Sequence, residues 1–136
     1  MDKVKWTKIM ATGVELMDKQ HKVFLELCDN LDQSVNSGKS KDEIHADLKF
    51  LEDYAKVHFA TEKHMMTLKK YPEREGHVKL HDYFMEEMKL MKGKAAAGET
   101  GPFFAEEIKE KVTDWFVIHI EKTDRKLGKY LNSLYK

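Results

Sequence analysis

The chain has 136 residues, enough for one domain with its own hydrophobic core. Its 24 basic and 24 acidic residues balance and form no basic block, which excludes a nucleic-acid binder or an anionic-membrane binder. No apolar run is long enough to cross a bilayer, and the N-terminal segment lacks the apolar core of a secretion signal. We therefore expect a cytoplasmic protein without membrane insertion, and the single cysteine, Cys28, fits a reducing compartment.

Residues 1–16 show no clear period and predict an N-terminal arm that packs across the rest of the molecule. From residue 17 onward, apolar residues recur in alternating steps of three and four, the spacing of helix seams in a bundle. The four stripes are Met17, His21, Phe24, Cys28, Leu31 and Val35; Ile44, Leu48, Leu51, Ala55, His58, Glu62 and Met65; His77, His81, Phe84, Met88 and Met91; and Phe104, Ile108, Val112, Trp115 and His119.

Turn and cap signals separate these stripes. Asp18 is predicted to cap the first helix, and residues 36–43 combine a glycine stop with Ser40 as the next cap. Residues 69–76 contain a proline, and residues 93–102 form the longest link. Short links between neighbouring helices favour up-down-up-down topology. We therefore predict an all-α four-helix bundle.

The apolar phase resumes after the fourth stripe as Asp124, Leu127, Leu131 and Leu134, which predicts a short C-terminal helix. We treat residues 1–136 as a single domain, with the arm at 1–16 and the bundle and C-terminal helix at 17–136. The step from His119 to Asp124 is five residues, roughly 140° further than whole turns around an ideal helix. One extra residue predicts a π-bulge or a local break in the helix, and either would return Asp124 toward the seam beside His119.

Five of the seven histidines occupy seam positions, whereas His45 and His64 lie one residue off the stripe. A lone histidine on an apolar face is usually a core residue with a satisfied hydrogen bond. Five of them, facing carboxylates across a bundle, need mutual partners or a cation. His58 and Glu62 are four residues apart and share a helical face, and His77 and His81 repeat this spacing. The pattern predicts a metal centre.

The donor types restrict the ion. No seam thiolate pair supports structural zinc or an iron–sulfur cluster, and no all-oxygen set supports calcium or magnesium. Imidazole with carboxylate suits iron, zinc, copper or nickel. Five histidines and two carboxylates are too many ligands for one ion, but they fit two ions bridged by both carboxylates. If both ions are octahedral and share a bridging oxygen, one position stays open for a small ligand.

In chain order, the histidine after "MDKQ", then "HFATE", "HVKLH" and "HIEKTD", resemble the hemerythrin family, in particular its single-domain bacterial members. The resemblance covers nearly the whole chain from about Trp6 onward. It implies a non-haem di-iron centre whose ligands are His21, His58, Glu62, His77, His81, His119 and Asp124. Family members often carry a second acid directly after the bridging glutamate; here that position is Lys63.

The resemblance also implies reversible dioxygen binding. One iron would take His77, His81 and His119, and the other would take His21 and His58 and keep the open position. Glu62 and Asp124 would bridge the two iron ions together with an oxo or hydroxo group. The residues expected to line a dry oxygen pocket are Phe24, Phe59, Trp115, Phe116 and Ile120.

The leading hypothesis is therefore an oxygen carrier, store or local delivery protein, a monomer whose recipient is an oxygen-consuming enzyme. A di-iron peroxidase or nitric oxide scavenger would use the same open position, and Tyr54 or Tyr83 could serve as its proton donor. An oxygen or redox sensor acting through a partner would need an exposed patch that changes with ligation. Iron storage is disfavoured because no acidic nucleation surface is evident.

Overall fold

The computed structural model describes residues 5–135. Three long helices come first: α1 (Glu15–Asn36), α2 (Lys41–Leu68) and α3 (Arg74–Ala96). A fourth, composite rod is built from α4 (Pro102–Ile108), η2 (Lys109–Asp114), α5 (Trp115–His119), η3 (Ile120–Asp124) and α6 (Arg125–Ser133). In the arm, one short 3₁₀ turn, η1 (Lys8–Met10), precedes α1.

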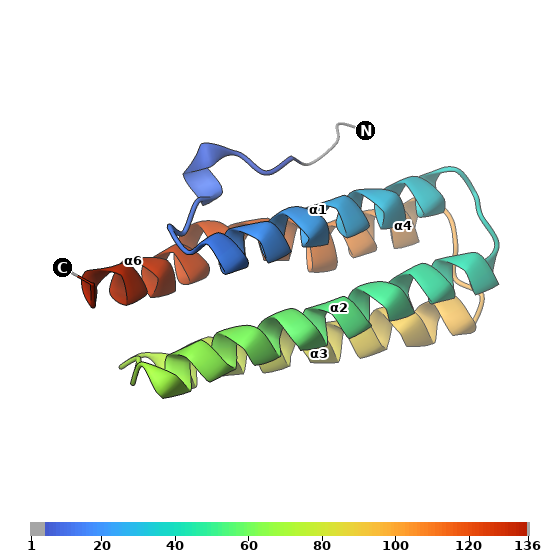
Figure 1. The fold of residues 1–136 in the computed structure, drawn as a ribbon. Helices are drawn as coiled ribbons and strands as arrows, with labels where there is room; N and C mark the ends of the chain where they lie inside the picture. Colours follow the sequence, from blue (N-terminus) through green and yellow to red (C-terminus); the bar gives the residue numbers. More distant parts are fainter. Residues whose placement is uncertain (1–4, 136) are drawn as a thin grey trace.

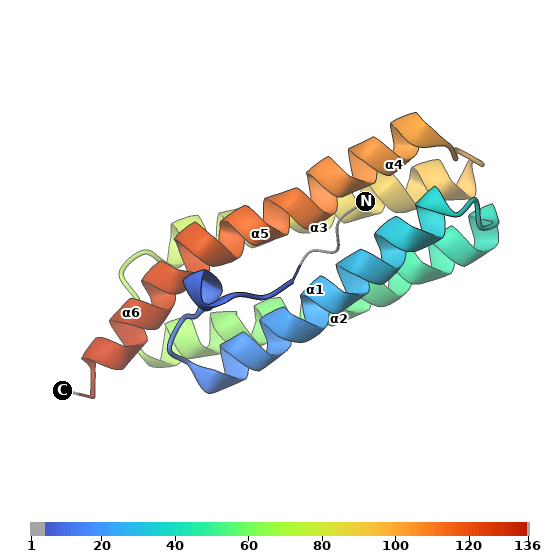
Figure 2. The same ribbon diagram turned by 90° about the horizontal axis from the view of Figure 1, so that it is seen from above.

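The four rods run alternately up and down the bundle (Figure 1). α2 packs against both α1 and α3, and the composite rod closes the bundle against α1 and α3. Seen from above, the arm lies between α1 and the red end of the composite rod (Figure 2). The all-α up-down-up-down prediction is confirmed, and residues 5–135 contain no strand. Within the same residues, no helix is both long and apolar enough to cross a membrane.

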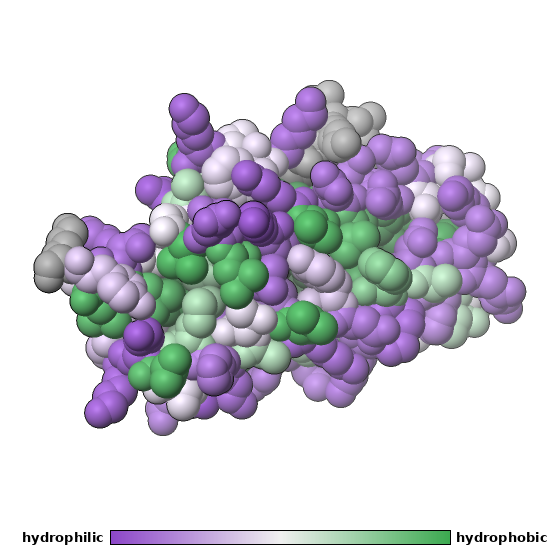
Figure 3. All heavy atoms as spheres, in the orientation of Figure 1, coloured by the Kyte–Doolittle hydropathy of each residue, from purple (hydrophilic) through white to green (hydrophobic). Residues whose placement is uncertain are grey.

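The buried apolar side chains fall into two clusters with a polar layer between them. On α1 the larger cluster includes Phe24 and the smaller one Met17, and His21 lies between these two residues. On α2, Phe59 and Met66 flank Glu62 in the same way. The outer surface is mostly polar on the face shown in Figure 3, with smaller apolar patches among the charged side chains. The seam histidines therefore form a polar layer across an otherwise apolar interior.

The turns agree with the sequence only in part. Ser40 caps α2 as predicted, in a reciprocal capping box with Glu43. The prediction for Asp18 was wrong, because α1 begins at Glu15 and Asp18 instead accepts hydrogen bonds from the Thr12 backbone N–H (2.9 Å) and hydroxyl (2.8 Å). The last link is shorter than predicted, since α3 continues to Ala96.

The composite rod contains two π-helical segments. The predicted one, η3, lies between His119 and Asp124 and is confirmed. The second, η2, was not predicted; its Thr113 is buried and donates a hydrogen bond to Asp32 Oδ2 on α1 (3.0 Å). Trp115 was expected in the core, but it is only half-buried, and Phe116 occupies the fully buried position instead.

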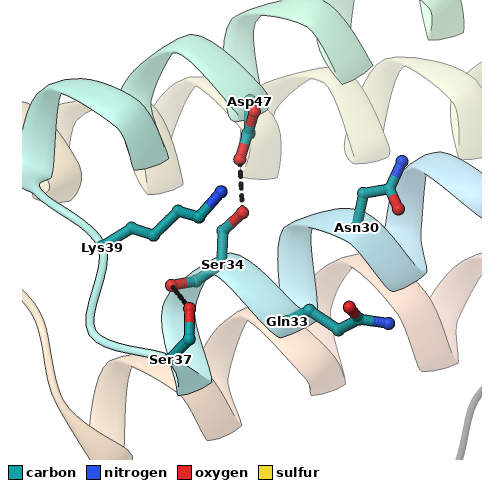
Figure 4. Close-up of a pocket in the computed structure, with 6 residues that line it drawn as sticks. All are labelled: Asn30, Gln33, Ser34, Ser37, Lys39 and Asp47. Atoms are coloured by element: carbon teal, nitrogen blue, oxygen red, sulfur yellow. Dashed lines mark hydrogen bonds between the residues drawn. The ribbon is translucent and has the colours of Figure 1, made fainter.

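At the end of the bundle where α1 turns into α2, a polar pocket has a volume of about 300 Å³ (Figure 4). Ser34 donates a hydrogen bond to Asp47 Oδ2 (2.7 Å) and accepts one on its carbonyl from Ser37 (3.2 Å). The first of these contacts connects α1 to α2, and the second closes the end of α1, where neither helix contributes to the polar layer. The pocket therefore belongs to the scaffold.

Gly128 fixes how closely the arm approaches α6. A Cβ added there would overlap the Thr12 backbone carbonyl oxygen, which also accepts a hydrogen bond from Asn132 Nδ2 (3.3 Å). We expect Gly128→Ala to lower the free energy of unfolding by about 1–3 kcal/mol, because the buried Thr12 must shift. Gly93→Ala in α3 is the matched control, since its Cβ would meet nothing within 4 Å; it should raise stability by about 0.5–1 kcal/mol. Urea unfolding of both variants is the measurement, and equal stability would contradict the contact.

Candidate metal centre

The structure brings all seven predicted ligands into one buried cluster, and none is more than 4% exposed. α1 contributes His21, α2 contributes His58 and Glu62, and α3 contributes His77 and His81. His119 ends α5, and Asp124 ends η3. The i,i+4 spacing on α2 places His58 Nε2 2.9 Å from Glu62 Oε2. The wider turn of η3 lets His119 Nε2 lie 3.2 Å from Asp124 Oδ1.

Three histidines gather around one oxygen of each carboxylate. His77 Nε2 and His81 Nε2 each lie 3.1 Å from Glu62 Oε1. His77 Nε2 also lies 3.1 Å from Asp124 Oδ1, the oxygen that faces His119. His81 Nε2 and His119 Nε2 are 3.2 Å apart. These five residues offer donor atoms that all lie within 4.8 Å of one another.

Two histidines gather around the other oxygen of each carboxylate. His21 Nε2 lies 2.8 Å from Asp124 Oδ2 and 3.4 Å from Glu62 Oε2, the oxygen that also faces His58. His21, His58, Glu62 and Asp124 form a second set of donors within 4.8 Å of one another. Each carboxylate therefore directs one oxygen to each set, which is the arrangement of two bridging ligands.

These donor atoms are better placed to bind two metal ions than to form hydrogen bonds with one another. His21 Nε2, His58 Nε2 and both oxygens of Asp124 have no aligned hydrogen-bond partner within residues 5–135, although they are buried and close together. Buried polar atoms without partners are expensive in an apolar interior. Two ligands about 2.1 Å from a common first-row metal stand about 3 Å apart at right angles, close to the observed separations. Imidazole with carboxylate suits such metals.

Without an ion, the cluster shifts the pKa values of its own members. Burial lowers the pKa of His21, but the carboxylates of Asp124 and Glu62 outweigh it and raise this pKa to about 9. The same balance raises the pKa of His77 to about 9. Burial lowers the pKa of His81 to about 4, only partly opposed by Glu62. The histidine cations, in turn, hold the pKa of Glu62 well below its usual value despite burial.

These shifts predict how the iron-free protein responds to pH. A histidine whose folded pKa lies above 6.5 stabilises the fold fully below pH 6.5 and loses that contribution as pH rises through its folded pKa of about 9. The loss is about 3 kcal/mol for each of His21 and His77, at about 1.36 kcal/mol per pH unit. Metal binding requires neutral imidazole, so the iron-loaded protein should not lose stability over this range. Urea unfolding of both forms from pH 6.5 to 9 measures the difference; an iron-free protein that gains stability toward pH 9 would contradict it.

Aromatic rings surround the two halves of the cluster unequally. Beside the two-histidine half, Phe116 lies 5.8 Å from the His21 ring and 6.0 Å from the His58 ring, and it stacks on Phe24 at 3.6 Å. Phe59 lies between the two halves, because it stacks on His81 at 3.8 Å and its ring is also 5.8 Å from the His58 ring.

The other two residues assigned to the oxygen pocket lie elsewhere around the centre. Trp115 stacks on His119 at 4.7 Å and therefore lies on the three-histidine half. Ile120 is fully buried in the larger apolar cluster. Of the five predicted pocket residues, Phe116 and Phe59 thus have the rings nearest the two-histidine half, and Phe24 stacks behind Phe116.

Sequence reasoning missed one polar residue at the site. Gln20 accepts a hydrogen bond on its side-chain oxygen from His58 Nδ1 (2.7 Å), on the side of the ring that faces away from the cluster. The sequence could have indicated this role only through the position of Gln20, which directly precedes His21 and lies one residue off the stripe.

The remaining residues singled out in the sequence, including the two candidate proton donors Tyr54 and Tyr83, lie outside the cluster. His64 and Lys63 are exposed, and His45 is half-buried near the start of α2. The Tyr54 hydroxyl donates to the backbone carbonyl of Gln20 (3.3 Å), and Tyr83 is 48% exposed. Cys28 is a free thiol in the apolar core, and burial raises its pKa far above the usual value.

A helical bundle with this buried donor set belongs to a class of metal-binding proteins, and comparison with known proteins identifies the family. The family model described as the hemerythrin HHE cation binding domain matches residues 12–131. The chain belongs to the hemerythrin family.

Curated relatives agree with this assignment. The chain is 30% identical to the bacteriohemerythrin of Methylococcus capsulatus over 129 residues, covering 94% of this chain and 96% of that protein. It is 29% identical to the bacteriohemerythrin of Pseudomonas aeruginosa over 119 residues (88% and 75%) and 29% identical to the myohemerythrin of Theromyzon tessulatum over 122 residues (90% and 88%). A crystal structure of wild-type hemerythrin superposes with a TM-score of 0.83 at 28% identity, covering 93% of this chain and 95% of that one.

Proposed function

We propose that this protein binds dioxygen reversibly at a di-iron centre and acts as an oxygen carrier, store or local delivery protein. The observation that carries the proposal is the uneven division of the donors. The three-histidine set offers one more protein ligand than the two-histidine set, while both share Glu62 and Asp124. The ion with fewer protein ligands is the one that accepts a small exogenous ligand. Iron, when bound, would supply the electrons that reversible dioxygen binding requires.

In this proposal, each ligand has a role that follows from its position. His77, His81 and His119 hold one iron, and His21 and His58 hold the other. Glu62 and Asp124 would hold both ions, because each directs one oxygen to each histidine set. The family resemblance implies an oxo or hydroxo group as a further bridge.

Buried aromatic rings keep water and protons away from the two-histidine half of the centre. The Phe24–Phe116 stack covers the two-histidine half, and both rings are fully buried. The Tyr54 hydroxyl donates to a backbone carbonyl, so it is not directed at the cluster. A two-histidine half covered by aromatic rings favours binding and release over turnover, which ranks a peroxidase or nitric oxide scavenger below a carrier.

The proposal places the protein in the cytoplasm as a monomer, with an oxygen-consuming enzyme as the recipient of the ligand. A reduced, unpaired Cys28 fits that compartment. A role as an oxygen or redox sensor would require a partner that binds one ligation state in preference to the other.

Spectroscopy of the iron-reconstituted protein tests the proposal. We expect about two iron ions per chain and a visible charge-transfer band that appears under air, disappears under argon and returns over repeated cycles. Iron binding without a reversible oxygen spectrum would overturn the carrier function. Sustained consumption of hydrogen peroxide or nitric oxide would favour an enzyme, and a ligand-dependent pull-down would favour a sensor.

A further inference from the structure

Gln20 connects the two helices that hold the two-histidine half of the centre. It directly precedes His21 on α1, and its side-chain oxygen lies 2.7 Å from His58 Nδ1 on α2. His58 is fully buried and turns its other nitrogen, Nε2, toward Glu62 Oε2 at 2.9 Å. His58 therefore carries its proton on Nδ1 and donates it to Gln20, which leaves Nε2 free to bind a metal.

Further contacts hold Gln20 in this orientation. Its side-chain nitrogen lies 3.5 Å from the Thr61 hydroxyl, which itself donates to the Val57 carbonyl (3.0 Å). Its backbone carbonyl accepts the Tyr54 hydroxyl (3.3 Å). The amide oxygen thus faces His58 because the amide nitrogen and the backbone have partners of their own.

The contact distinguishes His58 from other histidines of the cluster. Nδ1 of His21 and Nδ1 of His77 are buried without a hydrogen-bond partner within residues 5–135. His58 therefore differs from His21, the other histidine of its set, in having a neutral side-chain acceptor behind the ring. An acceptor at this place raises the electron donation of the imidazole to its metal, and a carboxylate would raise it further.

We infer that Gln20 is a positioning residue that sets the reduction potential of the two-histidine iron through the His58–Gln20 hydrogen bond. The inference rests on the proposed function, since this is the iron assigned to bind dioxygen. A neutral amide holds the ring in place without the added donation of a carboxylate. The oxidised iron is then stabilised less than it would be with a carboxylate at this position. The oxygenated protein therefore releases dioxygen more readily than it leaves the iron centre oxidised.

Two substitutions at Gln20 test this inference by moving the potential in opposite directions. In Gln20→Glu, a carboxylate accepts the His58 proton, stabilises the oxidised iron and lowers the midpoint potential. If the equilibrium between the reduced and the oxidised iron shifts tenfold toward the oxidised form, the midpoint potential falls by about 59 mV for a one-electron step. In Gln20→Leu, the acceptor is lost, the potential rises, and iron affinity falls by about tenfold. A purely structural role would move both variants in the same direction, which would overturn the inference.

Gln33→Glu is the matched control. Gln33 lies on the same helix, is exposed, and donates a hydrogen bond to Asp29 Oδ2 (2.7 Å) far from the cluster. The substitution adds the same charge to α1 and should leave the midpoint potential at the wild-type value. A shift as large as that of Gln20→Glu would mean that net charge, not the His58 contact, sets the potential.

A readout without iron or oxygen separates this inference from the proposed function. Long-range ¹H–¹⁵N spectra of the iron-free protein should show His58 protonated on Nδ1 in the wild type, with this resonance moved in Gln20→Leu and unmoved in Gln33→Glu. A His58 resonance that is the same in all three proteins would contradict the contact. If wild-type protein fails to bind dioxygen reversibly while the ordered potentials and the His58 signature persist, the proposed function fails and the role of Gln20 stands.

Discussion

Glu62→Ala is expected to abolish stable binding at both metal positions while leaving the helical bundle folded. Glu62 Oε1 faces His77 and His81, and Oε2 faces His21 and His58, so one substitution removes an oxygen ligand from each ion. We expect at least about 100-fold weaker iron binding, the upper end of what loss of a single supporting contact costs. Iron content per chain after gel filtration and far-UV circular dichroism measure the two halves of this prediction.

Two further alanine variants on α2 sharpen the comparison. His64→Ala, two residues away on the exposed side, should retain full iron content and the wild-type oxygen spectrum. His58→Ala should lose the two-histidine iron and keep part of the other, because all ligands of the three-histidine set remain. If His64→Ala empties the centre and His58→Ala does not, the assignment of the inner face of α2 is wrong.

Periodicity predicted most of the fold because every rod of the bundle faces the same interior. Steps of three and four placed His21, His58 and His77 on buried faces without any knowledge of the neighbouring helices, and the structure finds all three buried. The same reasoning detected η3, since Asp124 could reach the interior only if one residue were added to the turn.

The failures occurred where a contact distant in sequence overrides the local pattern. The local rule made Asp18 a cap, but Thr12 in the arm occupies its carboxylate and α1 begins earlier. η2 has no signal of its own, because its buried Thr113 pairs with Asp32 on another helix. A π-helical turn such as η2 contains one more residue than an α-helical turn. The added residue rotates Trp115 toward the edge of the bundle and Phe116 into its centre. Gln20 escaped notice for the same reason, since its partner His58 is 38 residues away.

The polar layer also explains why the bundle tolerates two π-helical segments in one rod. Residues of the two apolar clusters flank the layer on α1, α2 and the composite rod, so a register change within that rod moves ligands relative to both clusters. η3 brings Asp124 to the ion-facing side, and η2 ends directly before Trp115, whose neighbour Phe116 closes the two-histidine half. Local helix distortion therefore serves the site, and packing of the apolar clusters supplies the stability.

Phe116→Ala is expected to destabilise the protein and to expose the two-histidine half of the centre. Phe116 is fully buried, stacks on Phe24 at 3.6 Å and lies 5.8 Å from the His21 ring. Removing such a ring lowers the free energy of unfolding by about 3–5 kcal/mol and leaves a cavity. The cavity adjoins unpaired polar atoms of the centre, so it can admit water, and water promotes oxidation of the bound iron.

Phe103→Ala is the matched control, because Phe103 lies on the same rod and is 95% exposed. It should change the free energy of unfolding by less than about 0.5 kcal/mol and leave the lifetime of the oxygenated state unchanged. Urea unfolding measures the first quantity, and decay of the visible band under air measures the second. If Phe116→Ala loses stability but keeps the wild-type lifetime, the ring is a packing element only; a shorter lifetime in that variant alone would establish that the Phe24–Phe116 wall keeps the centre dry.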